Sequence, residues 1–168
     1  MRIKIDTREG DLQATCAQLA APHPSIQVET AQLPLGDVII CDDDGSERLI
    51  IERKTLNDLA ASIKDGRYEE QGYRLQQCEV DNHHIFYLIE GRFENYKPGK
   101  WRVERKALLS SFVSITCAKG FSLYRSDSIF ESAEWIVAYA EKLGRLQDKP
   151  KANYAAVSSR AKKAHITS

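Results

Sequence analysis

Apolar and polar positions along the chain alternate first with the period of a strand and then with the period of a helix. Residues 2–6 alternate polar and apolar, which predicts a short strand ending at Asp6. Apolar residues at helical spacing over 12–19 predict a helix closed by the prolines that follow, and residues 26–33 can form a second strand.

The most informative stretch is a pair of β-branched runs around an Asp-Gly dipeptide. Residues 38–41 and 47–54 predict two strands, and Asp-Gly at 44–45 is a strong hairpin signal. If these are the two turn residues, Val38 faces Ile51. The middle of this hairpin is apolar on both faces, so we expect a buried central pair of strands.

The same register places acidic side chains opposite each other at one end of the hairpin. Asp37 faces Glu52, and alternation puts Lys54 on their face. Two facing carboxylates repel unless a cation lies between them, and oxygen ligands suit Mg²⁺ or Mn²⁺. A nearby lysine can orient or help deprotonate an attacking water, or stabilise charge on a phosphate. The pattern predicts metal-assisted phosphodiester hydrolysis. The alternative is a strand-entry aspartate beside a solvated Glu–Lys pair.

The rest of the chain predicts an α/β order. Further helices are expected at 56–63, 68–80, 104–117 and 128–146, and further strands at 84–90 and 121–124. The expected fold is therefore a central mixed β-sheet with an antiparallel hairpin, flanked by helices. Residues 92–102 form a basic loop, and 148–168 are predicted to be a basic tail or linker.

The formal net charge of zero hides a segregation of charge. Residues 1–91 hold 9 Lys and Arg against 17 Asp and Glu, whereas residues 92–168 hold 15 against 7. An acidic half suits a site that gathers cations, and a basic half suits a surface that attracts polyanions. The alternative is a chance dipole on a solvated surface.

Length and composition narrow the class of protein. A chain of 168 residues, 42% hydrophobic, is large enough for one domain with a real core. No apolar run approaches ~18 residues, so no membrane span is predicted. The N-terminus lacks the apolar core of a signal peptide, so we expect an intracellular protein. The expected location is the nucleus if the protein is eukaryotic, and otherwise the cytoplasm or a viral factory.

The cysteines and paired histidines carry no predicted chemistry. Cys16, Cys41, Cys78 and Cys117 lie far apart without a CxxC pair, so all four are expected to be buried free thiols. Residues 83–84, a pair of histidines, are expected to serve surface and core packing rather than metal binding.

Several motifs in chain order resemble those of one nuclease family. Gly36-Asp37 followed by Glu52-Arg53-Lys54 and Asp58 resembles the GD…ERKxxxD signature of XPF/ERCC4-type structure-specific DNA endonucleases. Residues 6–9 resemble that family's D-x-R-E motif. Residues 33–37 and 62–71 match the segments that precede the aspartate and follow the signature. The similarity extends from residue 1 to about 145.

The resemblance implies a restriction-endonuclease-like core that cuts one DNA strand near a single/double-strand junction with Mg²⁺ or Mn²⁺. Asp37 and Glu52 would be the principal metal ligands, and Asp6 would contribute directly or through water. Arg53 and Lys54 would act on the scissile phosphate and the water.

Other motif positions take supporting roles under the same resemblance. Asp58 would orient the motif's lysine or arginine through an ion pair. Arg8 and Glu9 would support the metal shell. Arg67 could contact the DNA backbone, or simply begin a helix.

DNA binding requires a local basic patch, and the basic loop offers one. Its members are Lys97, Lys100, Trp101, Arg102, Arg105 and Lys106, together with Arg92 and Tyr96. The alternative is a solvated loop whose aromatic residues pack inward. The expected partners are branched DNA and a second subunit, in a homodimer or heterodimer formed through the nuclease domain.

One departure from the family concerns the C-terminal region. Family nucleases are usually followed by a helix–hairpin–helix module, and nothing after residue 150 resembles it. We therefore expect a nuclease domain at 1–147, with a tail that leads into a module absent from this chain. Two other functions remain open: a non-catalytic DNA-binding partner of an active subunit, and the same chemistry on RNA or small nucleotide phosphodiesters.

Overall fold

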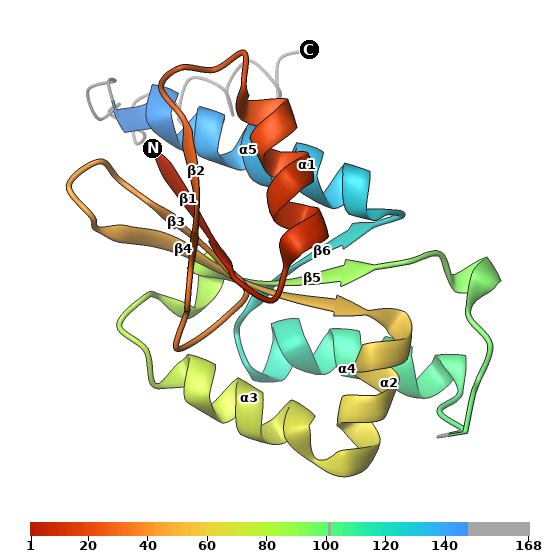
Figure 1. The fold of residues 1–168 in the computed structure, drawn as a ribbon. Helices are drawn as coiled ribbons and strands as arrows, with labels where there is room; N and C mark the ends of the chain where they lie inside the picture. Colours follow the sequence, from red (N-terminus) through yellow and green to blue (C-terminus); the bar gives the residue numbers. More distant parts are fainter. Residues whose placement is uncertain (101, 148–168) are drawn as a thin grey trace, which may run out of the picture.

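The charged N-terminal strand lies inside the sheet rather than at its edge (Figure 1). The computed structural model describes residues 1–100 and 102–147. Its six strands are β1 (Arg2–Asp6), β2 (Gln27–Ala31), β3 (Val38–Cys41), β4 (Glu47–Thr55), β5 (Ile85–Glu90) and β6 (Ser122–Ser126). They pair in the order β2-β1-β3-β4-β5-β6. The β1–β3 and β3–β4 pairs are antiparallel and the others are parallel, which confirms a mixed sheet.

Helices cover both faces of this sheet (Figure 1). One face carries α1 (Gly10–Ala20) and α5 (Ile129–Gln147), and the other carries α2 (Leu56–Asp65), α3 (Arg67–Gln76) and α4 (Arg105–Val113). Short 3-10 turns, η1 (Asn82–His84) and η2 (Phe93–Asn95), precede and follow β5, and a π-helical turn, η3 (Ser114–Ala118), extends α4. The predicted α/β order is confirmed.

Strand alternation divides the core into two layers. On β4, Ile51 packs in the layer with α1 and α5, whereas Ile50 packs in the layer with α2, α3 and α4. On β5, Leu88 and Ile89 divide in the same way. Because both faces of the central strands are covered, β3 and β4 form the buried pair that the apolar pattern predicts.

The hairpin register is as predicted, but its turn is not. Val38 pairs with Ile51 and Ile39 with Ile50. The turn, however, is a longer one, in which Asp42 donates its N–H to the Ser46 carbonyl oxygen at 2.9 Å and Gly45 has φ +90°. That turn shifts the pairing by one residue, and a bulge after Ile40 restores the predicted register.

Two expectations about side-chain environment are corrected or refined. Cys16 and Cys41 are buried free thiols, but Cys78 is half-buried and Cys117 is exposed. In η3 the buried side chain is that of Ile115, and Cys117, two residues further along the helical turn, faces solvent. Within the described residues, no helix has the length and apolar character needed to cross a bilayer. The predicted tail at 148–168 lies outside the described residues.

Candidate active site

A glycine with left-handed backbone geometry places the first carboxylate of the site. Gly36 has φ +76°, and its α-carbon lies so close to β4 that a Cβ would stand 2.7 Å from Ile50 Cγ2. The next residue, Asp37, donates its N–H to the Ile51 carbonyl oxygen at 2.8 Å. Asp37 Oδ2 then accepts the N–H of Arg53 at 2.8 Å. The carboxylate of Asp37 thus continues the β3–β4 ladder by one hydrogen bond.

The predicted convergence of acidic and basic side chains is observed. Asp37, Glu52 and Lys54 line one cavity of about 400 Å³, which is bounded on the helical side by α2 and α3. Other polar residues that line it are Arg8, Glu9, Arg53, Asp58, Arg67, Gln71 and Arg74. The cavity therefore brings together residues from the loop after β1, the segment before β3, strand β4 and the helices α2 and α3.

Burial leaves the two central carboxylates short of compensating charge. Desolvation raises the pKa of Asp37 to about 6, and desolvation together with the charge of Asp37 raises the pKa of Glu52 to about 7. Lys54 Nζ lies 3.7 Å from Glu52 Oε1. Among the described residues, no lysine or arginine forms an ion pair with Asp37 within 4 Å.

These residues fit a divalent cation of the Mg²⁺ class. The donors are carboxylate oxygens, Asp37 and Glu52 lie in one cavity, and Lys54 is the only cation within ion-pair distance of either carboxylate among the described residues. Gln71 Oε1 also faces the cavity region as a buried acceptor without a hydrogen-bond partner in the described structure. An acceptor of this kind could be satisfied by a water molecule of a hydrated ion.

Asp6 does not take the position expected of a direct metal ligand. Its Oδ2 accepts from Arg8 Nε at 2.7 Å and from the Arg8 N–H at 3.0 Å, and its Oδ1 accepts the Leu33 N–H at 3.0 Å. These bonds, the Arg8 side chain first, lower the pKa of Asp6 to about 2. Asp6 does not line the cavity of Asp37. The Asp6 carboxylate instead connects Arg8 to the Leu33 segment through these hydrogen bonds.

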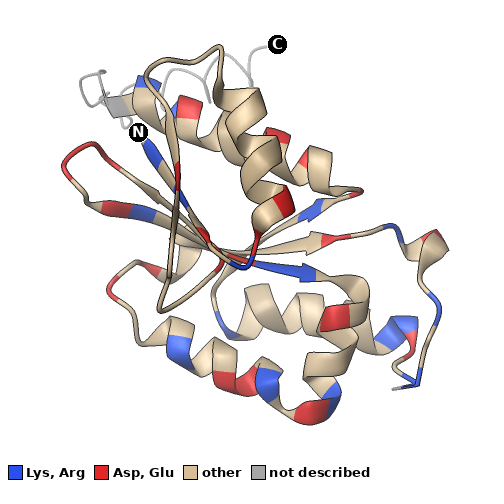
Figure 2. Cartoon of the chain, viewed as in Figure 1, with Lys and Arg blue, Asp and Glu red and all other residues tan. Residues whose placement is uncertain are grey.

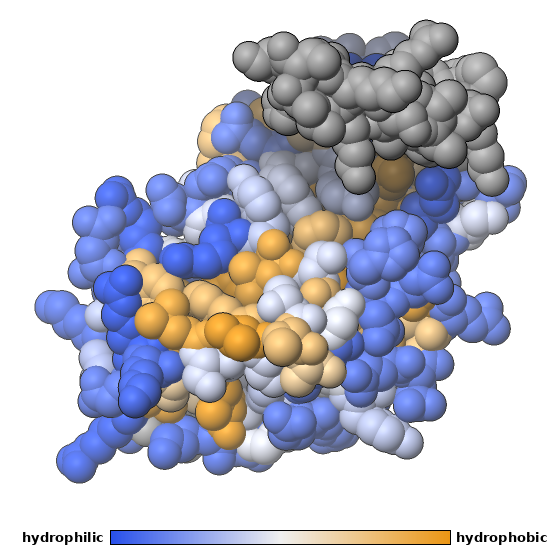
Figure 3. Space-filling view, turned by 180° about the vertical axis from the view of Figure 1, so that it is seen from behind, coloured by the Kyte–Doolittle hydropathy of each residue, from blue (hydrophilic) through white to orange (hydrophobic). Residues whose placement is uncertain are grey.

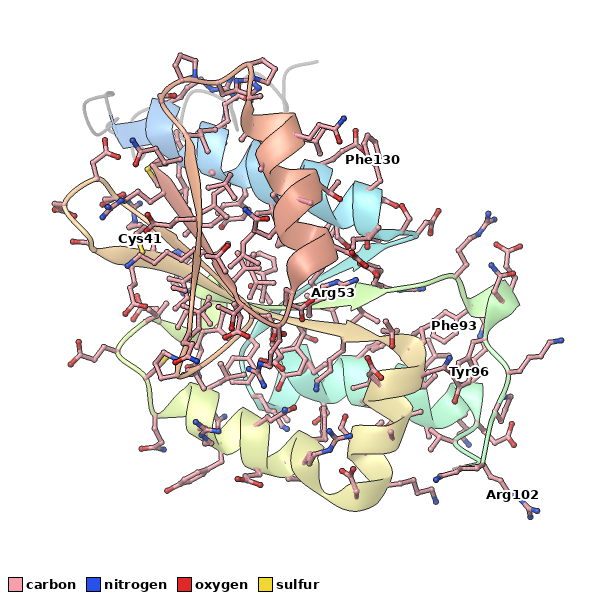
Figure 4. The ribbon with its side chains drawn as sticks, viewed as in Figure 1. Cys41, Arg53, Phe93, Tyr96, Arg102 and Phe130 are labelled. Carbon is pink, nitrogen blue, oxygen red and sulfur yellow. The ribbon has the colours of Figure 1, made fainter. Side chains whose placement is uncertain are left out.

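Arg53 lies with its side chain on the opposite face of β4 from Glu52 and Lys54. Its guanidinium donates to both carboxylate oxygens of Glu90, at 3.0 and 2.7 Å, and to Glu9 Oε2 at 2.7 Å. Figure 4 labels Arg53 where β4 passes the start of α1. The sequence reasoning missed Glu90. Its only available signal was an acidic residue at the end of an apolar strand.

Asp58 lines the cavity, but the expected ion pair is not formed. Its backbone N–H donates to Thr55 Oγ1 at 3.1 Å, which caps the N-terminus of α2. In the described part of the chain, Lys54 pairs with Glu52 and Arg53 with Glu9 and Glu90, so neither pairs with Asp58. The reason is that strand geometry directs Lys54 and Arg53 to carboxylates on their own faces of the sheet.

The remaining motif residues lie around the rim of the cavity. Glu9 precedes α1 and receives the Arg53 guanidinium, while Arg8 is largely exposed beside Asp6. Arg67 begins α3 after Gly66 and pairs with Asp65 at 2.8 Å. Both readings of Arg67, a helix start and a cavity-facing cation, are therefore compatible with its place.

The basic loop combines exposed cations with aromatic residues that pack inward. Lys97, Arg102, Arg105 and Lys106 are exposed. Tyr96 is half-buried and donates its hydroxyl to the Val103 carbonyl oxygen at 2.7 Å. Figure 4 shows Arg102 pointing away from the body of the molecule. Trp101 lies outside the described residues, so its predicted contact with DNA stays a prediction.

An arginine that the sequence reasoning missed joins this region. The guanidinium of Arg125 lies 4.5 Å from the ring centre of Phe93, and Arg105 lies 4.6 Å from the same ring. Lys100, also exposed, belongs to the same loop. Strand β6 therefore adds a cation to a patch that the sequence places only in the loop and α4.

Two neighbouring carboxylates with a lysine, at one end of a mixed sheet covered by helices, define a nuclease core of the restriction-endonuclease type. The family model of the ERCC4 domain matches residues 5–139. The chain belongs to the ERCC4 domain family.

Individual relatives agree with this assignment. The chain is 34% identical over 116 residues to the crossover junction endonuclease mus-81 of Neurospora crassa, covering 68% of this chain and 16% of that protein. It is 34% identical over 97 residues to the human structure-specific endonuclease subunit MUS81, covering 58% of this chain and 17% of that protein. The chain thus spans about a sixth of the length of these curated relatives.

Solved structures show the same fold. XPF from Aeropyrum pernix superposes with a TM-score of 0.67 at 25% identity, over 95% of this chain and 69% of that one. The same protein in a complex with DNA superposes with a TM-score of 0.64 at 24% identity, over 89% of this chain and 68% of that one.

Proposed function

We propose that this chain is the core of a metal-dependent endonuclease that hydrolyses DNA phosphodiesters at flaps, forks or junctions. The observation that carries the proposal is the half-buried Asp37 and the buried Glu52 beside Lys54 in one open cavity. The names of the relatives, a crossover junction endonuclease and a structure-specific endonuclease subunit, support the choice of branched DNA. The protein would act in DNA repair, recombination or replication. It would be located in the nucleus of a eukaryote, or otherwise in the cytoplasm or a viral factory.

The roles of the site residues follow from their positions. Asp37 and Glu52 would hold Mg²⁺ or Mn²⁺, which lowers the pKa of bound water and neutralises charge on a phosphate. Lys54 would orient the attacking water or donate a hydrogen bond to a phosphate oxygen. Arg67, on the cavity rim, would contact the backbone of the same DNA strand.

The basic patch would hold the DNA beside this cavity. Lys97, Lys100, Arg102, Arg105 and Lys106 lie in the loop after η2 and the first turn of α4, and Figure 2 shows lysine and arginine along that loop. Contacts of this kind release counterions from DNA. The affinity for DNA should therefore fall steeply as salt increases, without depending on sequence.

A second subunit is the remaining proposed partner. The face seen in Figure 3 carries a band of apolar residues. Large apolar side chains of the described residues that remain exposed include Leu109 and Val113 on α4, and Phe130 at the start of α5. Light scattering at several concentrations would show a dimer that Val113→Glu dissociates. A monomer at every concentration would contradict a homodimer and leave a heterodimer, which co-expression with a candidate subunit tests.

The test of the function is cleavage of end-labelled DNA. The substrates are a single strand, a duplex, a 3′ flap, a fork and a nicked junction, each with Mg²⁺, Mn²⁺ or EDTA. We expect metal-dependent cutting near the branch that Asp37→Asn abolishes. The matched control is Asp81→Asn, which removes an exposed carboxylate just before η1, and this variant should cut normally.

The other outcomes separate the alternatives. Cleavage that Asp37→Asn retains would contradict the proposed site. Cleavage of RNA or of a small nucleotide diester, with no cutting of branched DNA, would change the substrate and keep the chemistry. No cleavage, with DNA bound and no Mn²⁺ binding by calorimetry, would show a non-catalytic partner subunit.

A further inference from the structure

The main chain and the side chain of Arg53 make different contacts. The N–H of Arg53 donates to Asp37 Oδ2 at 2.8 Å, in line with the β3–β4 ladder. The guanidinium lies on the α1 and α5 side of the sheet, where it meets Glu90 and Glu9. This residue therefore links the proposed metal ligand to Glu90, which does not line the cavity.

Glu90 holds that guanidinium in a two-pronged arrangement. Its Oε1 accepts from Arg53 Nε at 3.0 Å and its Oε2 accepts from Arg53 Nη2 at 2.7 Å. A planar fork of this kind fixes the orientation of the side chain as well as its charge. Glu90 is 8% exposed and Arg53 keeps only 16% of its side chain exposed, so solvent screens the pair little.

The network continues beyond Glu90 into the last helix. Ser132 Oγ donates to Glu90 Oε1 at 2.7 Å, and Ser132 Oγ lies 2.6 Å from Ser126 Oγ. Both serines are buried. Hydrogen bonds thereby connect β4, the ends of β5 and β6, the residue before α1 and the helix α5 around the largely covered Arg53, which is labelled in Figure 4.

The Asp37 carboxylate is held by few groups that could keep it in place. Asp37 lies just before β3, at the end of the ladder, and the Arg53 N–H is the one hydrogen-bond donor recorded to its side chain among the described residues. A shift of the β4 backbone at Arg53 would therefore move this donor and release the carboxylate. The side chain that resists such a shift is anchored by Glu90.

We propose that Glu90, oriented by Ser132, is a positioning residue for Asp37. It fixes the side chain of Arg53 so that the backbone N–H of Arg53, which points along the sheet, holds the metal-binding carboxylate in place. This inference rests on the proposed function for its kinetic consequence. Its structural core, the coupling of Glu90 to the Asp37 hydrogen bond, is independent of that function.

The test combines a spectroscopic readout with kinetics. In a ¹⁵N-labelled protein, the Arg53 amide proton should resonate downfield because it binds a carboxylate, and Asp37→Asn should shift it upfield. Glu90→Gln keeps the shape of the side chain and removes its charge and one of its acceptors. We expect this variant to move the Arg53 amide at least halfway to its position in Asp37→Asn, and Ser132→Ala to move it in the same direction by less.

The kinetic expectation is a selective loss in the chemical step. Glu90→Gln should lower kcat by about 10- to 100-fold, in the range expected for a small misplacement of a catalytic group, while KM for DNA stays within about twofold. Glu90→Asp keeps the charge but not the reach, so it should restore part of kcat. The matched control is Glu134→Gln, an exposed glutamate on α5.

Each result supports or overturns the proposal. An Arg53 amide that stays in place in Glu90→Gln would overturn it, and so would a kcat equal to that of the control. Should Glu90→Gln fail to fold, Ser132→Ala must still move the amide, or the proposal is wrong. If the wild type cuts no substrate, the proposed function fails, while the amide shift still decides the coupling.

Discussion

Lys54 Nζ lies 3.7 Å from Glu52 Oε1, and the two side chains keep only 12% and 10% of their surface exposed. Asp37 faces the same cavity without an ion-pair partner in the described residues. One largely covered ammonium therefore lies beside two carboxylates, of which Glu52 is buried and Asp37 half-buried. It is too little charge to neutralise them, yet it is well placed to act on a water or phosphate held between them.

This arrangement predicts that Lys54 contributes to chemistry rather than to metal binding. Lys54→Met should lower the rate of cleavage by about 10²- to 10³-fold, the usual cost of one removed proton-transfer or electrostatic group. The Mn²⁺ affinity should stay equal or increase, because the substitution removes a competing positive charge. Single-turnover cleavage and calorimetry measure the two effects.

The matched control for Lys54 is Lys64→Met, an exposed lysine on α2. It should leave both the cleavage rate and the Mn²⁺ affinity unchanged. A Lys54→Met protein that cleaves normally but binds Mn²⁺ more weakly would reverse the assignment, because Lys54 would then only shape the carboxylate site.

The two neighbouring carboxylates, needed for metal binding, are expected to lower the free energy of unfolding of the metal-free protein. Without metal at pH 8, Glu52→Gln removes a buried charge beside Asp37, so its free energy of unfolding should rise by about 1 to 3 kcal/mol. Urea melts in EDTA measure this difference. Adding Mg²⁺ should stabilise the wild type and not the variant, because ligand binding to the folded state adds stability.

A glutamine variant that is less stable than the wild type in EDTA would contradict this account. It would mean that the Glu52 charge is compensated by Lys54 alone. A wild type whose melt does not respond to Mg²⁺ or Mn²⁺ would speak against the cation site itself.

The raised pKa values also fix the direction of a pH dependence. Asp37 and Glu52 have folded pKa values of about 6 and about 7, above ordinary values of 3.8 and 4.5. The folded state therefore binds protons more tightly than the unfolded state between about pH 4 and pH 7. The stability that this pair contributes is fully present below pH 4 and is lost as pH rises through 7.

Metal affinity should change in the opposite direction, since protons and the cation compete for the same oxygens. Calorimetry with Mn²⁺ at pH 5.5, 6.5 and 7.5 should show a steadily increasing affinity, and melts in EDTA should show a decreasing stability. The double variant Asp37→Asn with Glu52→Gln should abolish both trends. If these pH trends persist in the double variant, they arise from other titratable groups.

The hairpin register and the convergence of Asp37, Glu52 and Lys54 could be predicted because strand alternation is a local property. The predicted turn between the strands was wrong and displaced the pairing by one residue. The bulge after Ile40 corrects this displacement, so the pairing near the site is as predicted. The register at Val38 is set by burial of both faces of the strands rather than by the turn alone.

The parts that the sequence could not provide all depend on long-range contacts. Glu90 is 37 residues from Arg53 along the chain, and only the parallel pairing of β4 with β5 brings them together. The predicted partner of Asp58 failed for the same reason, since Arg53 and Lys54 each find a carboxylate on their own face of the sheet. Motif spacing shows which residues are near, and not which side chains meet.

Gly36 provides a prediction about the backbone that carries the site. Its φ of +76° is unfavourable for any residue with a Cβ, and that Cβ would stand 2.7 Å from Ile50 Cγ2 and 3.3 Å from the Ile51 carbonyl oxygen. Gly36→Ala should therefore destabilise the protein by about 1 to 3 kcal/mol or more and displace Asp37 from its bond to Arg53. Thermal melts and the cleavage rate measure the two consequences.

The matched control makes the same chemical change where the backbone has room. Gly10 is the first residue of α1, and a Cβ there meets nothing within 4 Å. Gly10→Ala should leave cleavage unchanged and should stabilise the protein by up to about 1 kcal/mol, because alanine favours a helix over glycine. If the two variants melt and cleave alike, the close approach at Gly36 does not hold Asp37 in place. If only Gly36→Ala loses activity, the left-handed turn before β3 is part of what positions the carboxylate.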